Sequence, residues 1–189
     1  MRILKSLLAA VFVSASFGAS ANGEIIVVET ADNALVYKVA DNGRLYQSYL
    51  GPRLGGYTDY RALPLGNEAY ICHGMEDYFE PALHINRPDG NSSTLLKYKS
   101  YRTDSIDGAA RTAIVLADPV YGDEVTLNIA AYGPENVFKA WSEIKNNEKT
   151  PIELEKYASA MLHLDAPEYY LTQYTGEWAD EAHQLTQQL

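Results

Sequence analysis

The stretch EVTLNIAAY, residues 124–132, decides the fold class of this chain. Its apolar side chains recur at every second position, and most of the positions between them are polar. The apolar set is Val125, Leu127, Ile129 and Ala131. A period of two is the pattern of a strand with one buried face, so this segment predicts a β-strand.

Similar short runs lie on both sides of this strand, separated by clusters of Gly, Asn, Asp and Pro. The further predicted strands are 24–29, 35–39, 45–50, 82–86, 94–101, 111–116, 137–146 and 168–174. Tight reversals are predicted at RPDGN (87–91), at YGD (121–123) and at DNG (41–43), because Pro fixes φ and Asp-Gly or Asn-Gly permits positive φ. Many short antiparallel strands predict an all-β chain folded as a large antiparallel β-sandwich.

Two segments are ambiguous. Thr150-Pro151-Ile152-Glu153 has the features of a helix start, and residues 154–164 are rich in helix formers, so local signals favour a helix there. The competing interpretation is a long strand, interrupted only by Lys156, with one apolar face. That face would hold Ile152, Leu154, Ala158, Ala160, Leu162 and Leu164. Residues 176–187 also allow a short terminal helix.

Composition excludes one class of function. The 189 residues include 15 Lys and Arg against 25 Asp and Glu, a formal net charge of −10, with no basic run. Binding to nucleic acid needs clustered positive charge, so no nucleic acid partner is expected. With 47 % apolar residues, the chain can bury one core, and one domain is predicted.

The N-terminus has the pattern of an export signal. Arg2 and Lys5 are followed by an apolar stretch and by the small residues Ala19-Ser20-Ala21, so residues 1–21 are predicted to be a signal peptide. Residues 22–189 would then be the exported chain, periplasmic or secreted. No later segment is long enough to cross a membrane. Cys72 is the single cysteine, so no internal disulfide is possible, and we expect a buried small hydrophobe rather than a reactive thiol.

Motifs for phosphate, dinucleotide or metalloprotease chemistry are absent from the sequence. The four histidines are spread singly, so neither a metal site nor a cofactor is predicted. The densest acidic group, Glu76, Asp77 and Glu80, is interpreted as a solvated loop face. The sequon at Asn91 is interpreted as a turn that enters a strand.

A long segment between Gly51 and Phe79 is crowded with Gly, Pro and Tyr, and loops of this length are usually functional or disordered. Its aromatic residues are Tyr57, Tyr60, Tyr70, Tyr78 and Phe79. Aromatic faces can contact sugars, and core packing or an interface explains the same residues equally well.

The order of segments resembles the N-terminal domain of glycoside hydrolase family 36 α-galactosidases. The run MEDYFEPALHINRPDGNSSTLLKYKSY, downstream of Tyr70, contains a Pro-Ala pair, an Asp-Gly turn and an L-x-Y strand in the family's order. Further similar segments are EVTL (124–127), AY (131–132), WSEIKNN (141–147), PIEL (151–154), YAS (157–159), YYL (169–171) and GEWADE (176–181). The likeness extends over nearly all of the chain after the predicted signal peptide.

This resemblance implies a supersandwich that precedes a (β/α)8 barrel, and it favours strand over helix for residues 152–164. It also implies that two aspartates on the barrel act in a retaining mechanism. The sequence ends at Leu189, so we expect a sandwich that is incomplete at its C-terminal end, no catalytic residue, and no activity of the chain alone. Family members form oligomers in which loops of this domain approach a neighbouring sugar pocket. Loose candidates for such contacts are Asp59, Tyr60 and Trp178.

The expected function is therefore that of a non-catalytic N-terminal domain of an exported α-galactosidase, whose partners would be the missing barrel, a galactoside and further copies of the full-length enzyme. Two alternatives stay open. One is a stand-alone carbohydrate-binding or lectin-like β-sandwich that uses the Tyr-rich loop, and the other is an exported structural module whose edge strands pair with partners.

Overall fold

The computed structural model describes residues 23–75 and 79–189. The signal peptide predicted for residues 1–21 lies outside the described residues, as do Glu76, Asp77 and Tyr78. Among the residues described, the model contains no helix that is both long enough and apolar enough to cross a membrane.

The described chain folds into twelve strands and one short helix. In chain order these are β1 (Ile25–Glu29), β2 (Asn33–Val39), β3 (Leu45–Pro52), α1 (Tyr57–Ala62), β4 (Asn67–Glu68), β5 (Leu83–Asn86), β6 (Lys97–Ile106), β7 (Ala109–Ala117), β8 (Glu124–Tyr132), β9 (Val137–Lys145), β10 (Glu153–Tyr157), β11 (Tyr170–Glu177) and β12 (Asp180–Gln188). The predicted all-β class is confirmed, and the largest shift of a boundary is at β6, which begins three residues later than predicted and runs on to Ile106.

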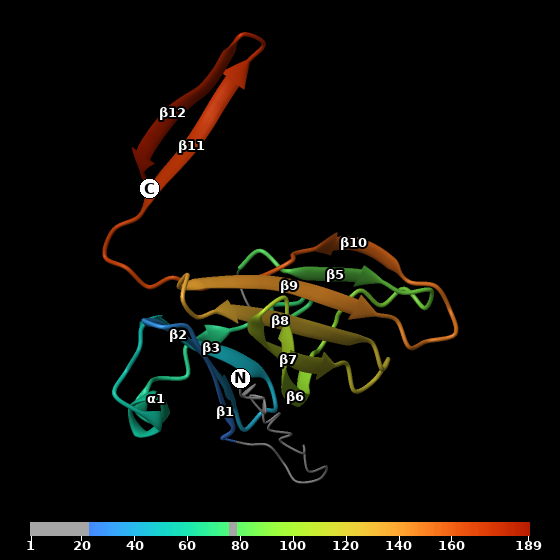
Figure 1. Ribbon diagram of the computed structural model, residues 1–189. Coiled ribbons are helices and arrows are strands. Elements are labelled where there is room, and N and C mark those ends of the chain that lie inside the picture. Colours follow the sequence, from blue (N-terminus) through green and yellow to red (C-terminus); the bar gives the residue numbers. More distant parts are fainter. Residues whose placement is uncertain (1–22, 76–78) are drawn as a thin grey trace, which may run out of the picture.

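Two four-stranded antiparallel sheets form the sandwich (Figure 1). The first has the order β1-β2-β3-β4, and the second has the order β6-β7-β8-β9. Strands β5 and β10 pair antiparallel as a separate two-stranded ribbon. In both sheets, strands that are adjacent in sequence pair with each other. Short turns join them as antiparallel hairpins, except that residues 53–66, which include α1, connect β3 to β4.

The core lies between the two sheets, and β8 supplies its centre. Leu127 and Ile129 pack with Leu35 and Tyr37 of β2 in one buried cluster, which Leu83 and Ile85 of β5 complete. The alternation seen in EVTLNIAAY therefore marks the inward face correctly.

Burial of the single cysteine is also confirmed. Cys72 is 3 % exposed, belongs to this core and forms an isolated parallel bridge with Leu83. Removal from water raises the pKa of its thiol, which keeps the sulfur protonated and unreactive.

The helix suggested by local signals after Thr150 is wrong. Residues 153–157 form β10, which pairs with β5 from Glu153↔Asn86 to Tyr157↔Leu83. Tertiary pairing outweighs local helix propensity at this place.

The single apolar face proposed for residues 152–164 is also wrong. β10 ends at Tyr157, so residues 158–164 form no strand, and the register of β10 with β5 shifts between Leu154 and Lys156. Ile152, Ala158 and Met161 pack against the core, whereas Leu154, Leu162 and Leu164 are 41 %, 49 % and 62 % exposed.

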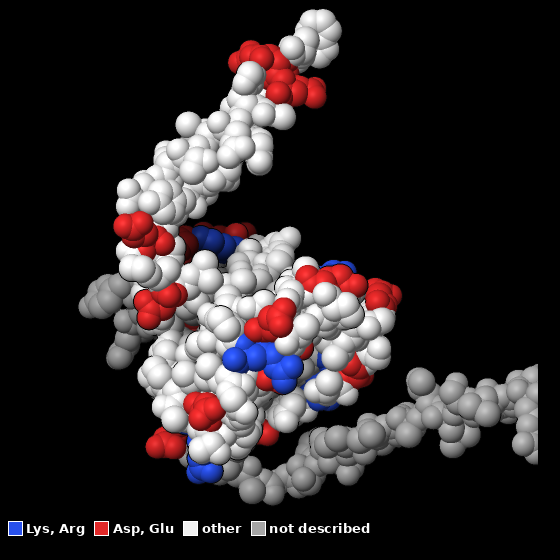
Figure 2. All heavy atoms as spheres, turned by 60° about the vertical axis from the view of Figure 1, so that its left-hand side comes forward, with Lys and Arg blue, Asp and Glu red and all other residues white. Residues whose placement is uncertain are grey.

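The terminal helix allowed over residues 176–187 is wrong as well, because β11 and β12 form an antiparallel hairpin there. The hairpin projects away from the sandwich (Figure 1), and every residue from 170 to 189 is exposed. We call this hairpin the arm. It carries no Lys or Arg, and acidic residues gather at its tip (Figure 2), namely Glu177, Asp180 and Glu181.

Candidate functional site

Part of the Tyr-rich segment packs against the first sheet. Helix α1 covers a small cluster on the outer face of that sheet, in which Tyr60 packs with Ala34 and Val36. The Tyr60 hydroxyl donates to Oε1 of Glu29 at 2.7 Å and accepts from the backbone N–H of Leu54 at 3.0 Å. Burial and this hydrogen bond to Glu29 raise the pKa of Tyr60, so the phenol stays neutral.

A buried lysine also fixes α1 to the sheet. The ammonium of Lys38 on β2 donates to the carbonyl oxygens of Arg61, at 3.0 Å, and Leu63. Since Lys38 is 9 % exposed, burial lowers its pKa, and the two carbonyls replace the water that its charge would otherwise bind. The local sequence predicts neither the hydrogen bond between Tyr60 and Glu29 nor the contact of Lys38 with α1.

The three residues predicted as loose sugar contacts do not lie together. Tyr60 is 3 % exposed, whereas its neighbour Asp59 is exposed on α1. Trp178 is 96 % exposed between β11 and β12, at the far end of the arm from the sandwich (Figure 1). Their contact with a carbohydrate stays a prediction.

The other described aromatic residues of the Tyr-rich segment are likewise either buried or exposed. Tyr70 is 1 % exposed, and its hydroxyl donates to the carbonyl oxygen of Ala158 at 2.7 Å, so it is part of the core. Tyr57 and Phe79 are 59 % and 58 % exposed.

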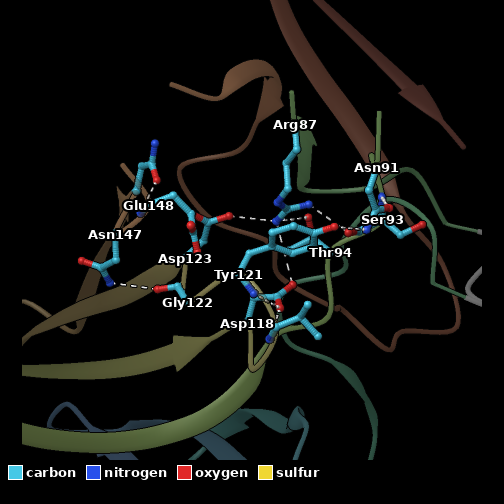
Figure 3. A network of polar contacts seen from close by, with 12 residues as sticks. Arg87, Asn91, Ser93, Thr94, Asp118, Tyr121, Gly122, Asp123, Asn147 and Glu148 are labelled. Carbon is cyan, nitrogen blue, oxygen red and sulfur yellow. Dashed lines mark hydrogen bonds and ion pairs between the residues drawn. The ribbon is translucent and has the colours of Figure 1, made fainter. Parts of the chain in front are cut away.

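A buried charge network forms the most developed polar site in the described chain (Figure 3). The Arg87 side chain is 2 % exposed, and its Nη2 lies 2.8 Å from Oδ2 of Asp123, which is 1 % exposed. Nη1 of Arg87 donates to the carbonyl oxygen of Ser93 at 2.9 Å, and Nη2 also reaches Oγ1 of Thr94 at 3.2 Å. Asp118 is the second buried carboxylate, with Oδ2 at 3.9 Å from Nη2 of Arg87.

Asp118 organises the backbone around this arginine. Its Oδ2 accepts from the N–H of Leu95 at 3.1 Å, and its Oδ1 accepts from the N–H groups of Val120 and Tyr121 at 2.8 and 3.2 Å. The carboxylate therefore holds the segment before β6 against the turn between β7 and β8. Of the network's buried side-chain atoms, Nε of Arg87 and Oδ1 of Asp123 have no hydrogen-bond partner.

Tyr121 links the network to the predicted RPDGN turn, which is confirmed by the hydrogen bond from the N–H of Arg87 to the carbonyl oxygen of Asn91. Its ring lies over the guanidinium of Arg87, 4.0 Å from the carbon to the centroid, and its hydroxyl donates to Asp89 at 2.8 Å. The N–H of Asn91 and the Tyr121 hydroxyl lower the pKa of Asp89, so this carboxylate stays charged. Nδ2 of Asn91 is also engaged, at 2.8 Å from the Tyr121 hydroxyl.

The geometry of this network indicates a structural role, in which it holds two turns together. The positive charge of Arg87 is held between two carboxylates and under an aromatic ring, and the cluster presents neither a nucleophile nor a free general base. The sequence marked residues 87–91 and 121–123 as turns, but it gave no sign that an arginine in one turn pairs with an aspartate in the other.

Two histidines that are apart in sequence meet in the structure. The rings of His73 and His84 stack at 3.8 Å between centroids, and Nδ1 of His84 lies 3.4 Å from Oε2 of Glu155. In residues 23–75 and 79–189, no group of three or more His, Cys, Asp or Glu side chains is placed to hold a metal ion.

Substitution of Arg87 by methionine should destabilise the chain strongly, because it leaves Asp118 and Asp123 buried without their cation. We expect a loss of about 3–5 kcal/mol in the free energy of unfolding, measured by urea denaturation. The matched control is Arg53→Met, which removes a surface pair with Glu29 whose side chains are 47 % and 32 % exposed, and should cost about 0–1 kcal/mol. Similar small losses for both variants would contradict the assigned role of Arg87.

Comparison with known proteins identifies the family of this chain. Residues 33–189 match the protein family described as the glycosyl hydrolase family 36 N-terminal domain. A comparison with curated proteins found no match.

Several solved structures share the fold. The α-galactosidase from Lactobacillus brevis is 21 % identical with a TM-score of 0.77, and AgaA from Geobacillus stearothermophilus is 20 % identical with a TM-score of 0.76; the matches cover 88 % of this chain. The galactosidase domain of the α-galactosidase–sucrose kinase AgaSK is 25 % identical over 87 % of this chain, with a TM-score of 0.75. The matched region is 27 %, 28 % and 28 % of the length of these three chains, respectively. Because the family match extends from Asn33 to Leu189, the chain belongs to the glycosyl hydrolase family 36 N-terminal domains.

Proposed function

We propose that this chain serves as the non-catalytic N-terminal β-sandwich of an exported α-galactosidase. The observation that carries the proposal is the family match over residues 33–189, together with the 28 % of AgaA that the chain spans. A retaining glycosidase needs two carboxyl groups about 5 Å apart on either side of the scissile bond. In this proposal both groups belong to the barrel that follows the sandwich.

The proposed substrate class of the full-length enzyme is the terminal α-galactosides. AgaA variants from Geobacillus stearothermophilus have been solved in complex with raffinose and with stachyose. Hydrolysis by the full-length enzyme would retain the anomeric configuration through a covalent glycosyl-enzyme intermediate.

The arm supports the idea that the sandwich works within a larger protein. A two-stranded hairpin is marginal in water, because neither of its faces is covered. The arm nevertheless exposes Leu171, Tyr174, Trp178 and Leu185, at 40 %, 67 %, 96 % and 48 %. We assign this surface to contact with the remainder of the α-galactosidase, either in the same chain or in a second copy of the enzyme.

Export is the further part of the proposal, and it rests on the sequence of residues 1–21. N-terminal sequencing of the chain recovered from the periplasm or medium of an expressing bacterium tests it. The recovered chain should begin at Asn22, because cleavage is expected after Ala21. A chain that stays in the cytoplasm with its first 21 residues attached would contradict export.

Two of the four described aromatic residues of the Tyr-rich segment are unavailable to a stand-alone lectin that uses this loop, and only Tyr57 and Phe79 are exposed. A sugar platform needs an accessible ring, and Tyr60 and Tyr70 are 3 % and 1 % exposed. Their hydroxyl groups are engaged with Glu29 and with the carbonyl oxygen of Ala158.

The purified chain should not hydrolyse 4-nitrophenyl α-galactoside above the rate of a buffer blank. The physical reason is that the pair of carboxyl groups that cleaves the bond is assigned to residues outside this chain. AgaA, assayed at the same molar concentration, serves as the positive control. Release of nitrophenol by the chain at a rate comparable to that of AgaA would overturn the assignment of the catalytic groups to the barrel.

A further inference from the structure

The outer face of the β6–β9 sheet carries an aromatic side chain among ordered polar ones. The register gives three rows of residues that share this face. They are Ser100–Val115–Thr126–Glu143, Arg102–Ala113–Asn128–Trp141 and Asp104–Arg111–Ala130–Lys139, each written from β6 to β9. We call this surface the Trp141 face.

The residue that follows Trp141 on β9 establishes which way the Trp141 side chain points. Ser142, the next residue on β9, faces inward, where its Oγ donates to the carbonyl oxygen of Ala158 at 2.8 Å. Because successive strand residues point to opposite faces, Trp141 points outward. It is half-buried rather than fully exposed, as expected for a ring that lies against the sheet.

Hydrogen bonds fix the indole in place. Oε1 of Glu143 accepts from Nε1 of Trp141 at 3.3 Å and from Nδ2 of Asn128 at 3.0 Å. Asn128 is 1 % exposed, so this contact anchors Glu143 to the sheet. An aromatic ring that is held before a ligand arrives loses little conformational entropy on binding.

Charges of both signs surround the ring. The ammonium of Lys139 lies 5.6 Å from the Trp141 ring centroid, near the outer limit of a cation–π contact. Across the face, Nε of Arg111 donates to Oδ1 of Asp104 at 2.7 Å, and this hydrogen bond lowers the pKa of Asp104. Between these charges, Ala113 and Ala130 are 1 % and 0 % exposed, so neither methyl group is available to a ligand.

We propose that the Trp141 face binds a neutral oligosaccharide. The C–H surface of one sugar ring would stack on the indole, and its hydroxyl groups would exchange hydrogen bonds with Glu143, Lys139 and Arg111. Such a ligand needs donors and acceptors together, which a face of mixed charge supplies, whereas an anionic polymer needs a cationic surface. The two middle residues of the row from Arg102 to Trp141, Ala113 and Asn128, are each 1 % exposed, so the proposed contact is one sugar ring on the indole.

This inference does not depend on the proposed α-galactosidase. It concerns a different face of the molecule from the Tyr-rich segment, and it predicts binding without hydrolysis. Trp178 provides an internal comparison, because it is also exposed but lies on the arm, outside this sheet. The chain has two tryptophans, so each one can be observed alone.

The test uses the full chain in two single-tryptophan variants, Trp178→Phe and Trp141→Phe, titrated with raffinose, stachyose and soluble galactomannan. The Trp178→Phe variant should show a saturable change in tryptophan emission with at least one of these probes, because Trp141 is its only indole. The Trp141→Phe variant should show none. No saturable change in the Trp178→Phe variant with any probe, or an equal change in both variants, would overturn the proposal.

A second readout keeps the result independent of fluorescence. The second readout is affinity electrophoresis through a gel that contains soluble galactomannan or stachyose coupled to the gel matrix. The affinity of the Trp141→Ala variant for the sugar in the gel should fall at least ten-fold. The Trp178→Ala variant should migrate like the unaltered chain. Equal urea midpoints for the two alanine variants show that folding is retained. Because neither readout involves bond cleavage, failure here is separate from failure of the proposed α-galactosidase role.

Discussion

Apolar contact between the two four-stranded sheets is the interaction on which the rest of this structure depends. With Cys72 as the single cysteine, no internal disulfide can stabilise the chain, and burial of side chains such as Leu35, Leu127 and Ile129 must do so. Each other element is fixed to this core. The hydroxyl of Tyr70 and Oγ of Ser142 converge on the carbonyl oxygen of Ala158, which closes the sandwich beside β9.

The arm is the exception, because nothing in the described chain covers it. The strands of the arm carry Leu171 and Leu185, whose neighbours in sequence are uncharged, and the tip of the arm is acidic. A segment of this kind gains little from hydrophobic burial until another surface meets it. This contrast between a self-supporting core and an uncovered hairpin fits a chain that spans 28 % of the related AgaA enzyme. The role of this chain in an α-galactosidase and the sugar contact at Trp141 are separate proposals, and they concern different surfaces.

Sequence patterns predicted the features that depend on local periodicity. The alternation at Leu127 and Ile129, the burial of Cys72 and the RPDGN turn all follow from neighbouring residues. The single strand face predicted for residues 152–164 is wrong because β10 ends at Tyr157, and its position is set by pairing with β5, which lies about seventy residues earlier. The contacts of Arg87 with Asp123 and of Tyr60 with Glu29 were missed for the same reason: each joins residues that are distant in sequence.

Hydrogen exchange followed by mass spectrometry on the intact chain tests the central claim most directly. The account predicts that amides of β8 exchange only through global unfolding, because both of its neighbours pair with it and most of its side chains are buried. Amides of β11 and β12 should exchange at rates close to those of an unprotected peptide. Protection of the arm equal to that of β8 would contradict the account, because the hairpin would then belong to the same cooperative unit as the core.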